Sequence, residues 1–121
     1  MGVNRSIFKS FSYALGGIKT AFKEEPNFKI HTAIAGLALV LALFLGFSPV
    51  EWVVLILTIF LVMAAELVNT AVEDTLNLVS PELNEKVKGI KDLMAAIVLL
   101  AAIAAVTVGV LLFVPKLLNL S

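Results

Sequence analysis

Residues 93–115 read LMAAIVLLAAIAAVTVGVLLFVP, an apolar run without a single charged side chain. The run is longer than the roughly 20 apolar residues that a helix needs to cross a bilayer. Residues 32–50 are likewise uncharged. Residues 52–65 are apolar but short, and this segment reaches spanning length only by continuing through Glu66 and Asn69 to about Leu78. Because lipid offers the backbone no hydrogen-bond partners, we expect three helices here.

The composition of the whole chain agrees with a membrane protein. Of its 121 residues, 60% are hydrophobic and 15% are charged, whereas soluble domains carry roughly a quarter charged residues. This excludes an ordinary soluble enzyme and a disordered chain. The formal net charge is zero, so no overall field attracts nucleic acid. The absence of cysteine excludes disulfide scaffolds, zinc ribbons and thiol nucleophiles. We therefore expect residues 1–121 to form one integral membrane domain.

Basic residues predict how the helices are oriented in the membrane. Five precede the first span, none lies in the connector at residues 46–49, three lie between the second and third spans, and one follows the third; in order they are Arg5, Lys9, Lys19, Lys23, Lys29, Lys86, Lys88, Lys91 and Lys116. The positive-inside rule then places the N-terminus and the second loop in the cytoplasm. We expect a multi-pass protein of the cell inner or plasma membrane.

The N-terminal segment has the pattern of a helix that lies on the membrane surface. Apolar residues recur every three or four positions, while the lysines lie off this stripe: Ile7, Phe11, Leu15, Ile18 and Phe22 form the stripe. Such a helix rests its apolar face on acyl chains and its lysines on anionic headgroups. Pro26 disfavours helical geometry at Glu25 and predicts a bend. The expected elements are a surface helix at about 4–25 and spans at about 28–47, 49–78 and 91–114.

Three further local signals concern helix ends and the first span. Residues 48–51, SPVE, have the serine cap, early proline and glutamate of a helix start, which indicates a structural role for Glu51. Residues 80–82, SPE, predict a second helix start within the inner loop, and they leave Glu82 with either role. His31 stands at the start of the first span, where we interpret it as an interfacial polar residue rather than a ligand.

The second span carries polar residues that a membrane helix normally avoids. Glu66, Glu73 and Asn77 point in nearly the same direction on a helix of 3.6 residues per turn, with Asn69 about 60° aside. A carboxylate within a span costs on the order of 3 kcal/mol on insertion scales. Hydrogen bonding between helices would explain a single asparagine. Two glutamates in register with Asn77 indicate function.

The two carboxylates lie about 10 Å apart along the helix axis, too far to share one ion, and so they suit different tasks. Glu73 can bind a divalent cation, since Mg²⁺ takes one or two carboxylates together with substrate phosphates. Glu66 is more deeply placed and suits a general base that takes a proton from a hydroxyl at the membrane boundary. Lys91 should stand near Glu73 and can hold phosphate oxygens, although Lys91 and Asp92 also suit an interface anchor and a helix start. Glu25 offers another carboxylate near the same plane.

These residues resemble a known family. The run AELVNTAVE at residues 65–73 is similar to the signature E-[LI]-x-N-[ST]-A-[IV]-E of the small prokaryotic diacylglycerol kinases. Lys91-Asp92 matches the lysine–aspartate pair of that family, and residues 25–28, EPNF, match its E-x-x-F element. The segment from Phe11 to His31 is most similar to the Gram-positive branch, the undecaprenol kinases. The resemblance covers nearly the whole chain.

The resemblance implies a homotrimeric helix bundle that transfers the γ-phosphate of ATP to a lipid alcohol, with Mg²⁺ as the metal. Each active site would lie between neighbouring subunits at the cytoplasmic interface. Carried over by position, Glu66 is the catalytic base, Glu25 and Glu73 bind the metal that accompanies ATP, and Asn69 and Asn77 support the site. The residues implied in nucleotide binding are Tyr13, Glu25, Glu73, Glu82, Asn84, Lys91 and Asp92.

The chain departs from the family pattern at two places. The family often has aspartate where Asn77 stands, and a tyrosine–histidine pair where Leu83-Asn84 stands. Asn77 keeps hydrogen bonding without charge, and Asn84 can still donate to a phosphate, so we expect an active enzyme.

Other functions remain open from the sequence. Undecaprenol is the acceptor that the branch indicates, and diacylglycerol is the alternative, because tail recognition by diffuse apolar contact leaves little trace in a sequence. A proton-coupled transporter subunit would also use an intramembrane glutamate. A non-enzymatic assembly protein would use the polar stripe only to hold helices together.

Overall fold

A computed structural model describes residues 6–82 and 84–119. This part of the chain holds four helices and no strand: α1 (Ile7–Glu24), α2 (Pro26–Leu45), α3 (Pro49–Val79) and α4 (Glu85–Leu117). By length and composition, α2, α3 and α4 are each able to cross a membrane. The expectation of an all-α membrane protein with three spanning helices is confirmed. The start of the surface helix expected at residue 4, together with Arg5 and Leu83, lies outside the described residues.

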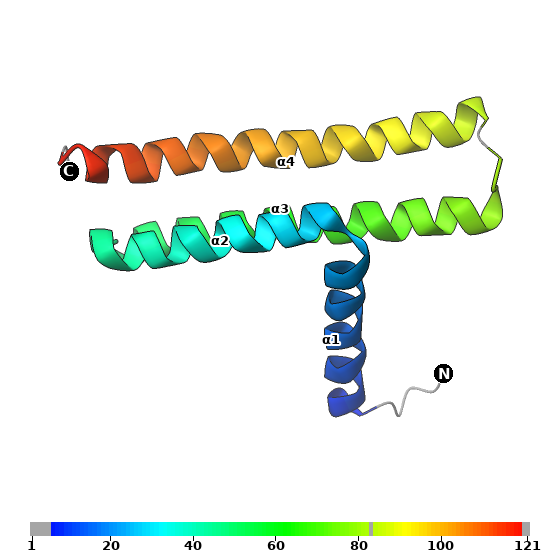
Figure 1. Ribbon diagram of the computed structural model, residues 1–121, viewed down its shortest axis with the longest axis horizontal. Coiled ribbons are helices and arrows are strands. Elements are labelled where there is room, and N and C mark those ends of the chain that lie inside the picture. The colour runs from blue at the N-terminus through cyan, green and yellow to red at the C-terminus, as the bar shows by residue number, and fades with distance from the viewer. Residues whose placement is uncertain (1–5, 83, 120–121) are drawn as a thin grey trace.

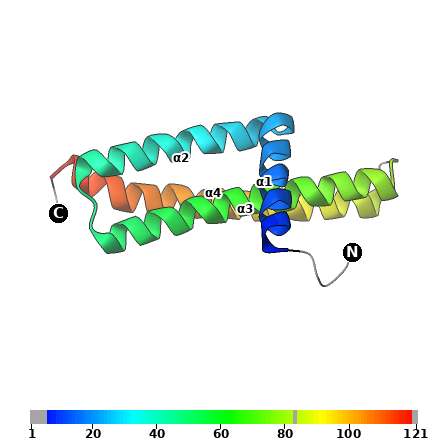
Figure 2. The ribbon, with the colours of Figure 1, turned by 90° about the horizontal axis from the view of Figure 1, so that it is seen from below.

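The three long helices run alongside one another, whereas α1 runs across them (Figures 1 and 2). With 20 residues, α2 is about 30 Å long, which matches the hydrocarbon thickness of a bilayer. With 31 residues, α3 is about 46 Å long and cannot lie wholly within that thickness unless it tilts. The paired ends of α3 and α4 therefore extend past the start of α2 and past α1 (Figure 1). We call this extension, formed by residues 67–79 and 85–97, the two-helix arm.

The bend between α1 and α2 falls at Glu25. Its backbone is extended, with φ −113° and ψ 105°, and Pro26 is the first residue of α2. This confirms the bend predicted from Pro26, whose ring disfavours helical geometry in the preceding residue. The large apolar side chains of α1 are mostly exposed, Phe8 and Phe11 among them. An apolar face left open on a helix that crosses the bundle suits contact with acyl chains at a membrane surface.

The connector between α2 and α3 is closed by local hydrogen bonds. Gly46 ends α2 with φ 69°, a left-handed conformation that glycine adopts without steric cost. Ser48 caps α3: its Oγ accepts from the backbone N–H of Glu51 at 3.2 Å, and the Glu51 carboxylate accepts from the Ser48 N–H at 2.8 Å. Glu51 also pairs with Lys116 of α4 at 3.3 Å. The structural role predicted for Glu51 is confirmed.

The turn between α3 and α4 differs from the prediction. Ser80, Pro81 and Glu82 do not begin a helix; α4 begins at Glu85. Ser80 instead ends α3, with its backbone N–H donating to the Leu76 carbonyl at 2.8 Å. Asn84 supplies the cap of α4, because its Oδ1 accepts from the Val87 N–H at 2.9 Å. An asparagine is as good an N-cap as serine, and here it begins the helix later.

Few side chains of the described residues are buried inside the bundle, and they include two small clusters. One cluster lies at the connector, where Phe47 stacks against Phe113 with ring centroids 4.9 Å apart. The other lies midway along the bundle and joins Val62 and Ala65 of α3 to Ala101 of α4. Most large apolar side chains of the spanning helices are exposed, which suits surfaces that face lipid or other membrane helices. The second cluster adjoins the polar residues of α3.

Candidate active site

The polar residues of α3 change from buried to exposed along the helix. Glu66 is 4% exposed. Asn69 and Glu73, in the next two turns, are half-buried, and Asn77 is exposed. The polar column therefore leads from the inside of the bundle out along the two-helix arm.

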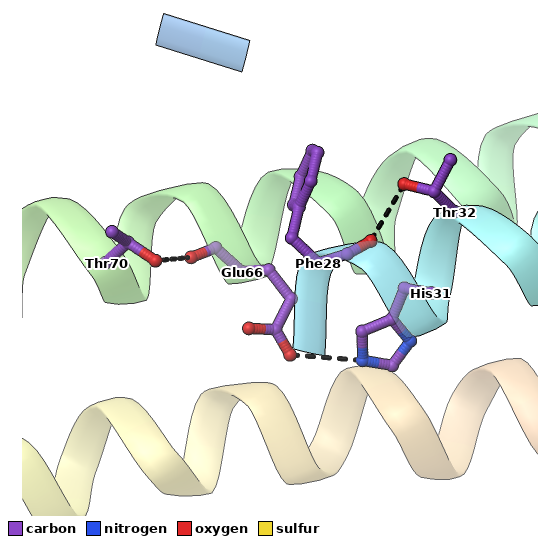
Figure 3. Close-up of polar contacts among 5 residues, drawn as sticks. All are labelled: Phe28, His31, Thr32, Glu66 and Thr70. Carbon is purple, nitrogen blue, oxygen red and sulfur yellow. Dashed lines mark hydrogen bonds and ion pairs between the residues drawn. The ribbon is translucent and has the colours of Figure 1, made fainter. Parts of the chain in front are cut away.

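Glu66 is held by a residue of another helix. Its Oε1 accepts a hydrogen bond from Nε2 of His31 on α2 at 3.1 Å. Both side chains point to the same side, toward α4 (Figure 3). The neighbouring hydroxyls bond within their own helices: Thr70 donates to the Glu66 carbonyl at 3.0 Å, and Thr32 donates to the Phe28 carbonyl at 2.8 Å. The side chains of Glu66 and His31 are thus hydrogen-bonded to each other, whereas the hydroxyls of Thr70 and Thr32 bond backbone carbonyls.

The depth of this pair follows from its position on α2. His31 is five residues beyond Pro26, the first residue of α2, which corresponds to about 8 Å along the axis. A helix as long as α2 spans the hydrocarbon core from end to end. The Glu66 carboxyl is therefore held at the second turn of α2, close to the end where that helix begins.

An apolar cavity of about 350 Å³ opens beside this pair. It lies between α2, α3 and α4, with His31 among its lining residues and Phe113 toward the connector. Nearly all the other lining side chains are aliphatic, Val62 and Val106 among them. Space next to the carboxyl is thus available to an apolar chain but offers almost no polar partner.

Negative charges gather where α1 meets α2 and the two-helix arm begins. The pKa of Glu25 is raised above its ordinary value, first by burial and then by the charges of Glu73, Asp74, Glu66 and Glu24. Like charges that face one another disfavour ionisation, and a cation would relieve them. Among the residues that the structure describes, no three acidic or histidine side chains converge as a metal site. The donors are carboxylate oxygens, the ligands that Mg²⁺ prefers when phosphates and water complete its shell.

Lys91 and Asp92 of α4 both lie on the two-helix arm. Lys91 donates to Oδ1 of Asn77 at 3.2 Å, which brings it to the polar column of α3, one turn beyond Glu73, the residue beside which we predicted it. Asp92 pairs with Lys88 at 2.8 Å on the exposed side of the same helix. The Lys91 ammonium thus lies beside the column, where a phosphate could displace the asparagine.

The remaining predicted residues are spread over three elements. Tyr13 lies on α1 and is exposed, Glu82 lies in the turn before α4 and is exposed, and Asn84 caps α4 while its Nδ2 lies 3.4 Å from the Ser80 hydroxyl. The contacts described for Glu82 and Asn84 do not join them to Glu66. We predicted a nucleotide contact for Asn84 and did not predict that its side chain caps α4.

His31 is the site residue that sequence reasoning missed. We interpreted it as an interfacial polar residue, yet its ring bonds the buried carboxylate of Glu66. One signal was available: both residues stand at similar distances along the chain from the short connector that joins their helices. Comparable depth follows from that arrangement, but contact depends on how the two helices rotate, which the sequence does not state.

A buried carboxyl beside a group of acidic residues, on helices able to cross a membrane, suits a membrane enzyme. Known proteins narrow this class. Residues 12–113 match the family described as prokaryotic diacylglycerol kinase. The chain is 43% identical over 95% of its length to the diacylglycerol kinase of Synechocystis, of which it covers 66%. It is 36% identical over 91% of its length to the undecaprenol kinase of Bacillus subtilis, covering 89% of that protein.

A third relative, the diacylglycerol kinase of Haemophilus influenzae, is 35% identical over 88% of the chain, which covers 92% of that protein. The protein therefore belongs to the prokaryotic diacylglycerol kinase family. Its family places it among the ATP-dependent phosphotransferases that act on membrane lipids. The resemblance seen in residues 65–73 is confirmed.

Proposed function

We propose that this protein transfers the γ-phosphate of ATP to the hydroxyl of a membrane lipid alcohol, undecaprenol. The observation that carries the proposal is the Glu66 carboxyl, which is 4% exposed and is held near the beginning of α2; this position supports a place near the boundary depth of the bilayer. The hydroxyl of a lipid alcohol occupies that depth because its apolar tail remains among the acyl chains. A carboxylate is a competent general base for such a hydroxyl.

In this mechanism Glu66 is the catalytic base. Its Oε2 accepts the hydroxyl proton while the alcohol oxygen bonds to the γ-phosphorus and the β–γ bridging bond breaks, with ADP as the leaving group. Phosphoryl transfer requires mainly positioning and neutralisation of charge. The remaining residues of the polar column, Asn69 and Asn77, support the geometry of the site.

Glu25 and Glu73 are the residues that would hold Mg²⁺. The mutual repulsion that raises the pKa of Glu25 supports a cation at this place, and the donors suit magnesium. When bound, the ion neutralises phosphate charge and screens the two carboxylates from the nucleotide. Lys91 would hold phosphate oxygens as a point charge once it leaves Asn77.

The nucleotide would lie along the two-helix arm, below the acceptor hydroxyl. Exposed polar side chains on the arm, its turn and α1 are available for it: Tyr13, Glu82, Asn84, Lys91 and Asp92. We place the arm and the N-terminus on the cytoplasmic side of a bacterial inner or plasma membrane. ATP is available there, and the distribution of basic residues favours this orientation. A homotrimer would complete each site with residues of a neighbouring subunit.

Diacylglycerol is the second candidate acceptor. The Synechocystis relative carries the name diacylglycerol kinase and is 43% identical, against 36% for the undecaprenol kinase of B. subtilis. The pattern of residues 11–31, which is most similar to the undecaprenol kinase branch, favours undecaprenol.

The test is transfer of label from γ-labelled ATP with Mg²⁺ in nanodiscs that contain one lipid alcohol at a time. Labelled undecaprenyl phosphate is the expected product. Labelled phosphatidate alone would show that the protein is a lipid kinase whose acceptor is diacylglycerol. A folded preparation that labels neither lipid would contradict the proposal and favour transport or assembly.

A further inference from the structure

The contact between His31 and Glu66 joins the predicted catalytic base on α3 to another helix, α2. His31 is the single histidine of the chain. Its Nε2 lies 3.1 Å from Glu66 Oε1, and the two side chains are 26% and 5% exposed. A hydrogen bond to a carboxylate is stronger in such a low-dielectric setting than in water. The bond therefore restricts the orientation of the Glu66 carboxyl.

The other oxygen of Glu66 differs from the first. Within residues 6–82 and 84–119, no hydrogen bond is made to Oε2, and no polar side-chain atom of this part is both fully buried and without a partner. Oε2 consequently keeps access to the space beside it, and Figure 3 shows it directed away from the imidazole. One oxygen is occupied by His31 and the other is open.

We propose that His31 is a positioning residue for the catalytic base: Nε2–H donates to Oε1 and thereby directs Oε2 at the acceptor hydroxyl. The proposal rests on the proposed function. In the reaction, the hydroxyl proton goes to Oε2, while His31 retains its own proton throughout. The cavity of about 350 Å³ that His31 lines provides apolar space between the spans next to the imidazole that holds Glu66.

A merely structural bond between α2 and α3 makes a different prediction. Such a bond would contribute to stability without affecting the chemical step. A positioning bond affects kcat, leaves the KM for ATP unchanged, and can be replaced by another donor at the same place. Glutamine offers an amide N–H close to the position of the imidazole Nε2, whereas asparagine is one carbon shorter and leucine offers no donor.

The contact itself is tested without any activity. Because the chain has one histidine, selective ¹⁵N labelling gives NMR signals from His31 alone. We expect these ring signals to shift in Glu66→Gln and to stay unchanged in Thr32→Val, a control one residue along whose hydroxyl bonds its own helix. Ring signals that do not respond to Glu66→Gln would overturn the proposal.

The catalytic consequence is tested by kinetics in nanodiscs. We expect His31→Leu to lower kcat about 10- to 100-fold, the cost of a slightly misplaced reacting group, at unchanged KM for ATP. His31→Gln should retain most of the wild-type kcat, His31→Asn should resemble His31→Leu, and Thr32→Val should be unaffected. Gln and Asn are both polar, so this pair decides the matter even if His31→Leu fails to fold.

Three kinetic results would overturn the proposal. His31→Asn with wild-type kcat would show that the bond is structural. His31→Gln as impaired as His31→Asn would show that the imidazole itself is required, as in a proton relay. If the wild-type protein phosphorylates no lipid alcohol, the proposed function is wrong, and this proposal fails with it even if the NMR contact persists. If the wild type is active and the His31 variants have the same kcat, only this proposal is wrong.

Discussion

The carboxylates at the two ends of the bundle have opposite electrostatic surroundings. At the connector, Glu51 accepts the Ser48 N–H at 2.8 Å and pairs with Lys116 at 3.3 Å. At the other end, Glu25 faces the charges of Glu73, Asp74 and other acids, and its pKa is raised. The first carboxylate is matched within the chain, while the others repel one another.

This contrast separates stability from function within one small protein. Groups whose partners are already present hold the fold together, and removing them weakens it. Groups that repel one another are retained at a cost to stability, which is common where a ligand or substrate supplies the missing charge. The contrast predicts that changes at the connector alter unfolding and changes at the arm alter catalysis.

The largest effect is expected for Glu66→Gln. Loss of a general base lowers kcat by about 10² to 10⁴-fold, and the amide of glutamine leaves the fold intact. Phosphate transfer from labelled ATP measures the loss, and equilibrium binding of Mg·ATP to the same preparation should be nearly unchanged. Equal loss of binding and turnover would argue against a base.

Glu73→Gln should have the next largest effect. We expect turnover to fall by about 10² to 10³-fold, the range for removal of one group that stabilises transition-state charge, with a higher requirement for Mg²⁺. Activity as a function of Mg²⁺ concentration checks this. A variant with the Mg²⁺ dependence of the wild type would remove Glu73 from the cation site.

Lys91→Met should weaken ATP binding more modestly. A single phosphate contact by a lysine contributes about 1.5–3 kcal/mol, equivalent to roughly a 10- to 150-fold rise in the KM for ATP. The KM for the lipid should stay constant. If both values rise together, Lys91 contributes to the fold rather than to the nucleotide site.

Glu25→Gln should stabilise the protein when no divalent cation or nucleotide is present. The pKa of Glu25 is raised in the folded state, so the wild type is more stable when the group is protonated and loses this stability as pH rises through the raised pKa. We expect the apparent Tm of the variant above that pH to exceed that of the wild type by a few degrees and to depend less on pH. Thermal denaturation across pH, without Mg²⁺, measures the difference.

The smallest effect is expected at the connector. Lys116→Met removes the partner of Glu51 but leaves the capping bonds with Ser48 in place. Partly exposed ion pairs contribute little to stability, so the apparent Tm should fall slightly and kcat should not change. A loss of turnover would contradict the division between the two ends.

Much of this architecture was predictable because membrane helices follow composition closely. Runs such as residues 93–115 have no alternative to a helix in lipid, and Pro26 and Ser48 mark helix boundaries through local chemistry. The start of α4 was mispredicted because SPE and Asn84 are both good starts, and the choice between them depends on how α3 ends.

The site was predictable only along one helix. The polar column of α3 follows from the helical repeat, and the lysine beside it follows from the short turn to α4. The partnership of His31 with Glu66 depends on the rotation of α2 against α3, which are packed together through Ala42 and Leu55 near the connector. Helical periodicity within one segment carries no information on that rotation.

The central claim is that Glu73 on the arm and Glu25 at the bend between α1 and α2 hold a divalent cation together with ATP, and that Glu51 at the connector does not. Mn²⁺ in place of Mg²⁺ allows this to be measured by electron paramagnetic resonance in nanodiscs with ATP. We predict an immobilised Mn²⁺ signal in the wild type and in Glu51→Gln, and its loss when Glu25→Gln and Glu73→Gln are combined. An immobilised signal that survives the combined substitution, or one that disappears in Glu51→Gln, would contradict the account.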